Sequence, residues 1–341
     1  MLFRPVRESD LDQLNELARQ SLYGLTTVPK DEALMGKRVR ESERSFANLE
    51  DADPQGQLYL FVLIDPKLDR VVGTSGVVSK VGGFKPFYAY RLEHETQTSV
   101  TLTHEITHPV LHLVKEHDGP SEIGSLFLHP DYRGGGRGRL LSLSRFLFMA
   151  EFEHLFEQEV IAEMRGIIDE KGSSPFWEAL GSRFFPLDLP NADMLTLIQK
   201  DFIEELMPTH PIYLDLLSDE ANAAVAEVHP NTVPARRMLE SEGFSFRDLV
   251  DIFEAGPVLH CQRSEIRSAK ESRVRTIESV FEAPTSEPLK CVVAASKGGF
   301  RSSLGLVIET ESGISLDHAC FEHLGVSVGD AVRYVESRPK A

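Results

Sequence analysis

The chain has 341 residues, of which 41% are hydrophobic, enough for a substantial core in one large domain or two ordinary ones. Its formal net charge of −17 argues against a general binder of nucleic acid or of acidic membrane surfaces, because both need a basic surface. The three cysteines are widely spaced and odd in number, which favours a reducing compartment without a disulfide framework. No apolar run approaches a membrane span and the start lacks a secretory signal, so we expect a soluble cytoplasmic protein.

Three strands and two helices are predicted in the first 80 residues. Apolar spacing separates the two types, because helices repeat every three to four residues and strands every two. The expected order is strand 2–6, helix 11–18, helix 31–49, strand 58–64 and strand 71–79. Such an opening is typical of a mixed α/β fold.

A zinc-protease signature, H-E-x-x-H, runs from His104 to His108. That chemistry needs a helix, so that both histidines share one face. Here residues 99–103 alternate apolar and polar side chains, and Pro109 disfavours helix at the preceding histidine. On a strand the two histidines lie roughly 13 Å apart, too far to share one zinc ion. We therefore expect strand histidines and no metal site.

The most informative stretch follows, at residues 122–148. An apolar strand pattern over 123–128 leads through His-Pro-Asp-Tyr into a glycine loop and then a helical pattern over 140–148. Glycines before a helix start let a ligand approach backbone N–H groups, and the helix dipole favours an anion. The loop residues predicted to bind it are Arg133, Gly134, Gly136 and Gly138. The alternative is an ordinary glycine-rich turn.

This loop matches neither of the common nucleotide motifs. No Lys-Ser/Thr follows the last glycine, as a P-loop requires, and the dinucleotide fingerprint is absent. The form Arg-x-x-Gly-x-Gly after a strand resembles the pyrophosphate loop of the GNAT acyltransferases, which bind an acyl-coenzyme A. The resemblance implies a GNAT-like mixed twisted sheet flanked by helices, an α/β (α+β) fold.

The whole chain is expected to divide into three parts. Residues 1–258 form the acyl-CoA-dependent transferase domain, 259–284 a polar linker, and 285–341 a small β-rich, barrel-like domain. Residues 184 and 185 are both phenylalanine and are predicted as a core pair. Further elements predicted in the first part are strand 160–164, helices at 175–180 and 202–207, a helix within 211–228, a helix ending at Gly243, and strand 246–253.

Several strings are more specific than a general GNAT pattern, and they resemble the arginine N-succinyltransferase family. They lie at 24–29, 125–138, 162–166, 174–177, 204–208, 211–213, 228–230 and 251–253. The family transfers the succinyl group of succinyl-CoA to the α-amino group of L-arginine in bacterial arginine degradation. The resemblance implies succinyl-CoA as co-substrate, no tightly bound cofactor and no metal. It also implies a homo-oligomer or a heterodimer with a related subunit.

The resemblance also implies roles for individual residues. His229, in Val-His-Pro, corresponds to the family's proton donor, and Leu126 to a leucine that contacts succinyl-CoA. Many GNAT enzymes instead use a tyrosine where Leu239 stands, and leucine has no proton to give. With an ordinary pKa near 6.5, a histidine suits proton exchange at neutral pH. The alternative is that His229 only orders a turn before Pro230.

The remaining site predictions concern the co-substrate carbonyl and the two charged substrates. A backbone N–H of strand 125–128, including Leu126, Phe127 and Leu128, is expected to polarise the thioester carbonyl. The succinyl carboxylate needs a cation and the guanidinium needs carboxylates, for which Arg165 and Glu163 are candidates. Either one is equally suited to a structural ion pair.

Two departures keep alternatives open. Residues 254–257 read Glu-Ala-Gly-Pro where Asp-Gly-Gly-Pro is common in the family, and some members form paired, diverged subunits. The alternatives are an N-acyltransferase for another amine such as ornithine, or one that uses acetyl-CoA, and a non-catalytic acyl-CoA-binding subunit.

Overall fold

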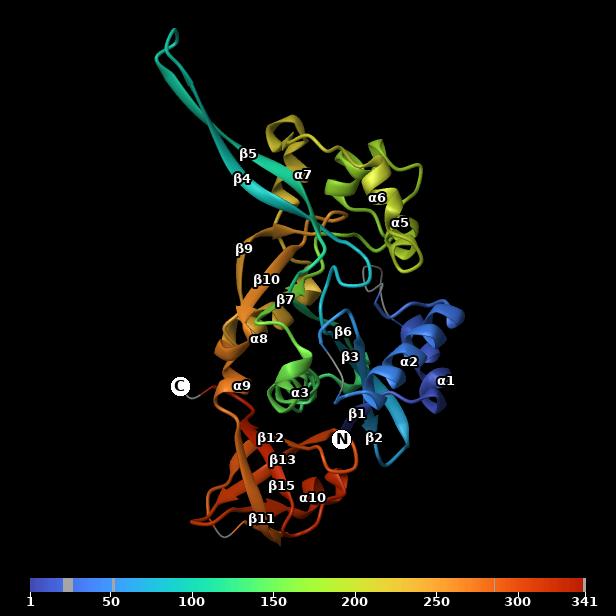
Figure 1. The fold of residues 1–341 in the computed structure, drawn as a ribbon, viewed down its shortest axis with the longest axis vertical. Helices are drawn as coiled ribbons and strands as arrows, with labels where there is room; N and C mark the ends of the chain where they lie inside the picture. Colours follow the sequence, from blue (N-terminus) through green and yellow to red (C-terminus); the bar gives the residue numbers. More distant parts are fainter. Residues whose placement is uncertain (21–26, 51–52, 285, 340–341) are drawn as a thin grey trace.

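The computed structural model describes residues 1–20, 27–50, 53–284 and 286–339 (Figure 1). The helices are α1 (Leu11–Arg19), α2 (Glu32–Ala47), α3 (Arg137–Glu151), α4 (Pro175–Ala179), α5 (Leu189–Thr196), α6 (Asp201–Leu206), α7 (Asp219–Ala224), α8 (Val233–Ser241), α9 (Arg267–Lys270) and α10 (His318–Leu324). The strands are β1 (Leu2–Pro5), β2 (Leu58–Asp65), β3 (Arg70–Val78), β4 (Phe87–Ser99), β5 (His104–Glu116), β6 (Ser121–Leu128), β7 (Glu159–Glu163), β8 (Ile212–Tyr213), β9 (Ser245–Val250), β10 (Pro257–Gln262), β11 (Arg273–Phe281), β12 (Leu289–Ala295), β13 (Arg301–Glu309), β14 (Ile314–Asp317) and β15 (Ala331–Glu336).

The central sheet has the order β1-β2-β3-β6-β7-β10-β9-β4-β5-β8. Neighbouring strands are antiparallel except β6 and β7, which are parallel. This mixed sheet with helices on both faces is the arrangement expected from the sequence.

Strand β2 explains how the sheet holds its two helical layers. Its run Leu-Tyr-Leu-Phe-Val-Leu-Ile is continuously apolar, as is usual for a strand covered on both faces. Tyr59, Phe61 and Leu63 enter the core under α3, whereas Leu60 and Val62 enter the core under α1 and α2. Figure 1 shows α3 apart from the α1–α2 pair, with the sheet between them.

A second lobe covers the far half of the sheet. Helices α4 to α6 enclose Trp177, Phe176 and Phe185, which pack with Tyr90 of β4. Phe184 is 38% exposed, so the predicted core pair is wrong at this position. It directly precedes Phe185, whose ring stacks on Trp177, so only the second phenylalanine of the pair reaches the core.

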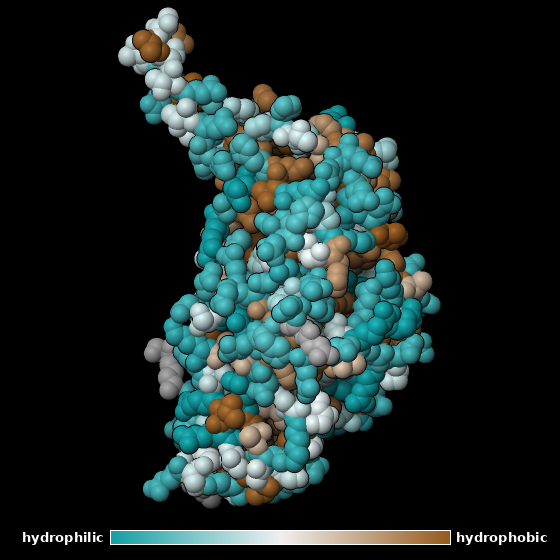
Figure 2. All heavy atoms as spheres, viewed as in Figure 1, coloured by the Kyte–Doolittle hydropathy of each residue, from teal (hydrophilic) through white to brown (hydrophobic). Residues whose placement is uncertain are grey.

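Beyond this lobe, residues 93–109 of β4 and β5 project as a two-stranded arm (Figure 1). Val100 and Leu102 at its tip are exposed, and Figure 2 shows apolar side chains there on an otherwise mainly hydrophilic face. His104 and His108 both lie on β5, so the zinc-protease motif is on a strand, as predicted.

The C-terminal strands close into a five-stranded barrel. The order β12-β15-β11-β14-β13 is completed by pairing of β12 with β13. Its outer face packs on α3 through Val292, Ala294 and Val335. Part of the segment predicted as a linker, 259–284, is in strands, because β10 continues to Gln262 and β11 starts at Arg273. The three domain boundaries stay a prediction, and residues 24–26 of the string 24–29 lie outside the described residues.

Candidate functional site

The glycine loop sits between β6 and α3, in backbone geometry that the sequence requires. Gly134, Gly135 and Gly136 have φ of 93°, 60° and 81°, the left-handed region that favours glycine. Gly136 is the N-cap of α3, and the first turn of this 15-residue helix carries no acidic side chain. The free N–H groups and dipole of such a helix start make the loop suited to a phosphate group.

Gly138 serves the loop differently, since its φ is not positive and a Cβ placed there meets no atom within 4 Å. Arg137, between the glycines, lies over the Tyr132 ring at 5.8 Å and donates to the Tyr132 carbonyl. The loop therefore presents one open face, beside Gly134 and Gly138.

Strand β6 carries a bulge before it reaches this loop. Gly124 pairs with Gly76 and Phe127 with Thr74, so Ser125 and Leu126 together lie opposite one residue of β3. Ser125 has φ of 52°, which is uncommon for a residue with a side chain. A bulge takes a residue out of regular pairing and turns its backbone groups, so it can free a donor near Leu126.

Strands β6 and β7 separate just before the bulge. Their parallel pairing covers only Ser121 with Val160 and Glu122 with Ile161. Leu126 and Leu128 then lean on the α3 core, and Phe127 packs on the α1–α2 side. The C-terminal halves of these strands are thus not paired with each other, and we call the place where they diverge, just before the glycine loop that follows β6, the opening.

His229 lies beyond the end of β7. Its backbone N–H donates to the Arg165 carbonyl at 2.9 Å, which fixes it two residues past Glu163. Its Nδ1 accepts the Asn231 N–H at 3.1 Å, so in this arrangement the neutral ring carries its hydrogen on Nε2. Burial lowers the pKa of His229 below its usual value, and the Arg165 guanidinium lowers it further.

Leu239, one helix further on, is 5% exposed and belongs to the α3 core. Leu239, which has no proton to donate, therefore fills the position where many GNAT enzymes have a proton-donating tyrosine.

A cavity of about 740 Å³ lies on the sheet face opposite α3, enclosed by α2, the segment after β3, and α5 to α6. Glu163 lines it, together with Glu122 and Asp251, and the lining cations include Arg38 and Lys200. Of these five, only Glu163 had been proposed as a site residue from the sequence, because the others lie far apart in the chain, on α2, on β6 and in two connecting segments, with no common motif.

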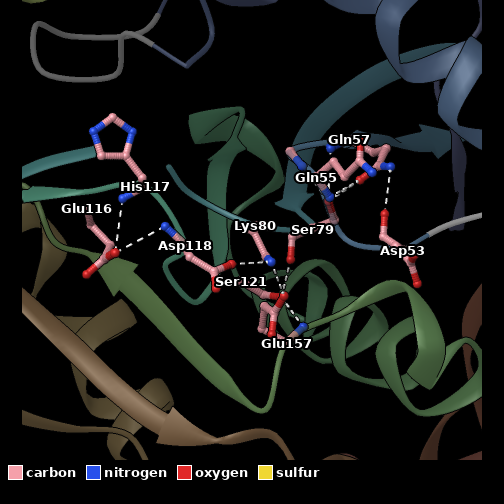
Figure 3. A network of polar contacts seen from close by, with 11 residues as sticks. Asp53, Gln55, Gln57, Ser79, Lys80, Glu116, His117, Asp118, Ser121 and Glu157 are labelled. Carbon is pink, nitrogen blue, oxygen red and sulfur yellow. Dashed lines mark hydrogen bonds and ion pairs between the residues drawn. The ribbon is translucent and has the colours of Figure 1, made fainter. Parts of the chain in front are cut away.

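One lining cation is already neutralised. Lys80 forms ion pairs with Asp118 and with Glu157, the latter at 2.8 Å. Ser121 Oγ donates to the Ser79 carbonyl and accepts the Glu157 N–H, so the network ties this wall to β6 (Figure 3). Arg38 differs, because its Nε is buried and has no hydrogen-bond partner among the described residues.

Arg165 is not part of the cavity lining and instead neighbours His229. Its Nε is buried without a hydrogen-bond partner in the described part of the chain. Glu254, close to it, accepts the Gly166 N–H at 2.8 Å. The structure thus separates the two predicted substrate-binding residues: Glu163 faces the cavity and Arg165 the histidine.

The described residues include no cluster of three or more His, Cys, Asp or Glu placed to hold a metal ion. His108, on the exposed arm, contacts Asp215 of the turn that follows β8. Among the helices that the structure describes, none has the length and apolar content to cross a membrane.

Known proteins match the chain along its whole length. Residues 1–268 match the family model described as arginine N-succinyltransferase beta subunit, and 273–336 the model of its C-terminal domain. An arginine N-succinyltransferase of Enterobacter sp. (strain 638) is 41% identical over 341 residues, covering 100% of this chain and 98% of that protein. One from Salmonella schwarzengrund (strain CVM19633) is 42% identical over 336 residues, covering 98% and 97%.

A solved structure is also similar, that of arginine/ornithine succinyltransferase subunit AI from Pseudomonas aeruginosa. It has a TM-score of 0.89 and 32% identity, and the match covers 99% of each chain. The expected GNAT-like fold with a β-rich C-terminal region is confirmed. With family matches over both parts of the sequence, the chain belongs to the arginine N-succinyltransferase family and is an acyltransferase.

Proposed function

We propose that this chain transfers the succinyl group of succinyl-CoA to the α-amino group of L-arginine, in the cytoplasm and as a step of arginine breakdown. One observation supports it most: the opening between β6 and β7 has an anion-binding loop on one side and a cavity with both charges on the other. Full-length relatives named arginine N-succinyltransferase support the choice of substrates.

The co-substrate binds along β6 in this proposal. The pyrophosphate lies against Arg133, Gly134, Gly136 and Gly138, and the thioester reaches the bulge. There a backbone N–H at Leu126, within the stretch 125–128, polarises the carbonyl, because a fixed donor favours the charge that develops on oxygen. No metal and no tightly bound cofactor takes part.

His229 acts on the departing sulfur. The amine nitrogen attacks the carbonyl carbon, the C–N bond forms and the C–S bond breaks. The nitrogen releases one proton to solvent and the departing thiolate takes one from solvent, so the step balances, while the neutral His229 ring stabilises the sulfur by a hydrogen bond and keeps its own proton. The ring offers Nε2–H to the sulfur, because Nδ1 is held by the Asn231 N–H. The lowered pKa keeps this neutral form dominant at pH 7.

The two carboxylates of the substrates need cations. The succinyl carboxylate meets Lys200 or Arg38 in the cavity, since neither has an ion-pair partner in the described residues. Arg165, beside His229, is placed instead to face a group near the reacting centre. Acetyl-CoA lacks the carboxylate, so we propose that it is the poorer co-substrate.

Thiol release from succinyl-CoA with a panel of amino acids tests the function. Arginine should give the highest kcat/KM, above ornithine, the other amino acid in the name of the Pseudomonas relative. An equal or better rate with acetyl-CoA would remove the succinyl assignment. Binding of acyl-CoA without any turnover would favour the non-catalytic subunit.

We also propose that the chain assembles, as a homo-oligomer or with a related subunit. The exposed apolar tip of the arm supports contact with another chain, because an isolated hairpin is marginal in water. The molar mass of the purified chain, measured by light scattering, distinguishes a homo-oligomer from a monomer, and a monomer would favour the heterodimer with a related subunit.

A further inference from the structure

Two carboxylates of the cavity, those of Glu122 and Glu163, lie on the neighbouring strands β6 and β7, diagonally across from each other. The parallel register pairs Glu122 of β6 with Ile161 of β7. Glu163 is two residues beyond Ile161 and therefore on the same face of the sheet. Neither carboxylate has a hydrogen bond or ion pair in the described part of the chain.

Their surroundings make this pairing costly without a ligand. The Glu163 side chain is exposed to the cavity, yet desolvation by the surrounding walls raises its pKa well above the usual value; Glu122 and Asp251 raise it further, and Lys200 opposes them. Burial likewise raises the pKa of Glu122. Asp251 is fixed in place, because its Oδ1 accepts the N–H groups of Phe253 and Glu254. Lys200 and Arg38 lower the pKa of Glu122, but neither forms an ion pair with either carboxylate within the described residues. A cation that contacts both carboxylates directly would therefore relieve their repulsion further.

The opposite wall has the complementary feature. Arg38 of α2 lines the same cavity, and its buried Nε lacks a hydrogen-bond partner within the described ranges. Buried polar atoms are normally satisfied, so an unpaired guanidinium nitrogen facing a cavity indicates an absent acceptor. The cavity thus offers carboxylates and a cation, which fits two groups of opposite charge: the guanidinium of one substrate and the succinyl carboxylate of the other.

We propose that Glu122 and Glu163 together bind the guanidinium of the amine substrate and set the preference for a cationic side chain. This inference rests on the proposed function. A guanidinium is planar and always charged, and its N–H donors point along several edges. Two carboxylates on neighbouring strands can accept from different edges, which an ammonium or a neutral side chain matches less well.

L-citrulline is the probe that isolates this contact. It has nearly the size and shape of L-arginine, but its ureido end is neutral. In the wild type, kcat/KM for arginine should greatly exceed that for citrulline. In Glu163→Gln, and separately in Glu122→Gln, the arginine-to-citrulline ratio should fall about 10- to 100-fold, the usual worth of hydrogen bonds to a charged group. The KM for succinyl-CoA should stay within about twofold.

Glu159→Gln is the matched control. Glu159 lies on the same strand and the same face as Glu163, but Arg247 pairs with it at 2.6 Å. The arginine-to-citrulline ratio of kcat/KM in Glu159→Gln should equal that of the wild type. A purely structural role for Glu163 predicts a lower Tm in Glu163→Gln with an unchanged ratio, and that result overturns the inference. Removal of like-charge repulsion predicts a Tm at or above that of the wild type.

Thermal shift with free L-arginine reads the site without catalysis. The wild type should be stabilised by arginine more than by citrulline, and Glu163→Gln should lose the difference. If the wild type binds arginine in this way yet never succinylates it, the proposed function fails and the inference stands. If the wild type succinylates arginine and both Gln variants keep the full preference, the inference fails and the function stands.

Discussion

The two sides of the opening between β6 and β7 are built in different ways. On the α3 side, consecutive residues form the loop, and backbone geometry carries the binding: Gly134 to Gly136 all have positive φ. On the cavity side, Arg38, Glu122, Glu163 and Lys200 come from three separate elements and the residue before α6, and side-chain charge carries it. A contiguous site tolerates few substitutions, whereas a dispersed site can be retuned one residue at a time.

The strongest test concerns His229, the proposed catalytic residue. His229→Ala should lower kcat by about 10²–10⁴-fold, the usual range for a catalytic proton or hydrogen-bond donor, with acyl-CoA affinity nearly unchanged. His229→Gln should recover part of the rate, because an amide N–H can occupy the place of Nε2–H. Single-turnover kinetics on folded enzyme measure both. Full activity of the Ala variant per folded molecule contradicts the mechanism.

The pH profile separates two forms of the histidine. A charged ring as obligatory donor predicts that kcat falls as pH rises through its pKa, which lies below 6.5. Donation by the neutral ring predicts no loss between pH 6.5 and 8, while the rate gains from the deprotonating amine. We expect the profile of the neutral ring, measured as kcat/KM for arginine. A decline that begins below pH 7 and vanishes in His229→Ala would instead show that the charged ring is the donor.

Next in size is a test of the cavity cations. Lys200→Met should lower kcat/KM for succinyl-CoA about 10-fold and leave acetyl-CoA nearly unaffected, because only succinyl has the second carboxylate. Lys297→Met, on the barrel and paired with Asp330, is the control and should change neither co-substrate. Equal losses with both acyl groups would assign Lys200 to arginine or to folding instead.

Gly138→Ala tests the loop side with a smaller expected effect. The residue is free of positive φ and of close neighbours, so an added methyl meets only the ligand. We expect KM for succinyl-CoA to rise about 3- to 10-fold, with an unchanged Tm. Gly136→Ala is the contrast, because the φ of 81° at this position is unfavourable for alanine and the added Cβ would lie 3.1 Å from Leu304 Cδ1, so the Tm should fall as well. An unchanged KM in Gly138→Ala would contradict the loop assignment.

The same contrast explains what the sequence could predict. The strand, glycine loop and helix from Ser121 to Glu151 follow from local spacing, and all three elements form as predicted. The strand assignment of the zinc-protease motif followed from Pro109 and alternation, again local signals. Local pattern, however, says nothing about which distant segments meet. In the sequence Arg38 looks like any other helix residue. Only the fold places it in the same cavity lining as Glu122 of β6 and Glu163 of β7.

The domain prediction shows the same limit. Residues 263–272 are polar and charged, and they looked like part of a linker. In the structure Arg267 pairs with buried Glu242 at 2.6 Å, and Ser268 N–H donates to the other oxygen of that carboxylate. A charged segment can thus be firmly packed when its partner lies on another element, which composition alone does not reveal.

The smallest expected effect is on stability, and it measures the strain that the acidic groups impose on the ligand-free protein. Burial raises the pKa of Glu254 from 4.5 to about 8, with Asp251 adding to it. Between these pH values the folded state holds a proton on Glu254 that the unfolded chain has lost, so stability should fall as pH rises from about 4.5 to 8.

Glu254→Gln keeps an acceptor for the Gly166 N–H and removes the titration. Its Tm should exceed the wild-type Tm by several degrees at pH 8, and the two should converge near pH 5. Saturating L-arginine should narrow the gap at pH 8, since its cation relieves the neighbouring carboxylates. A variant that melts below the wild type across this range would mean that the ionised Glu254 stabilises the fold, most directly through Arg165.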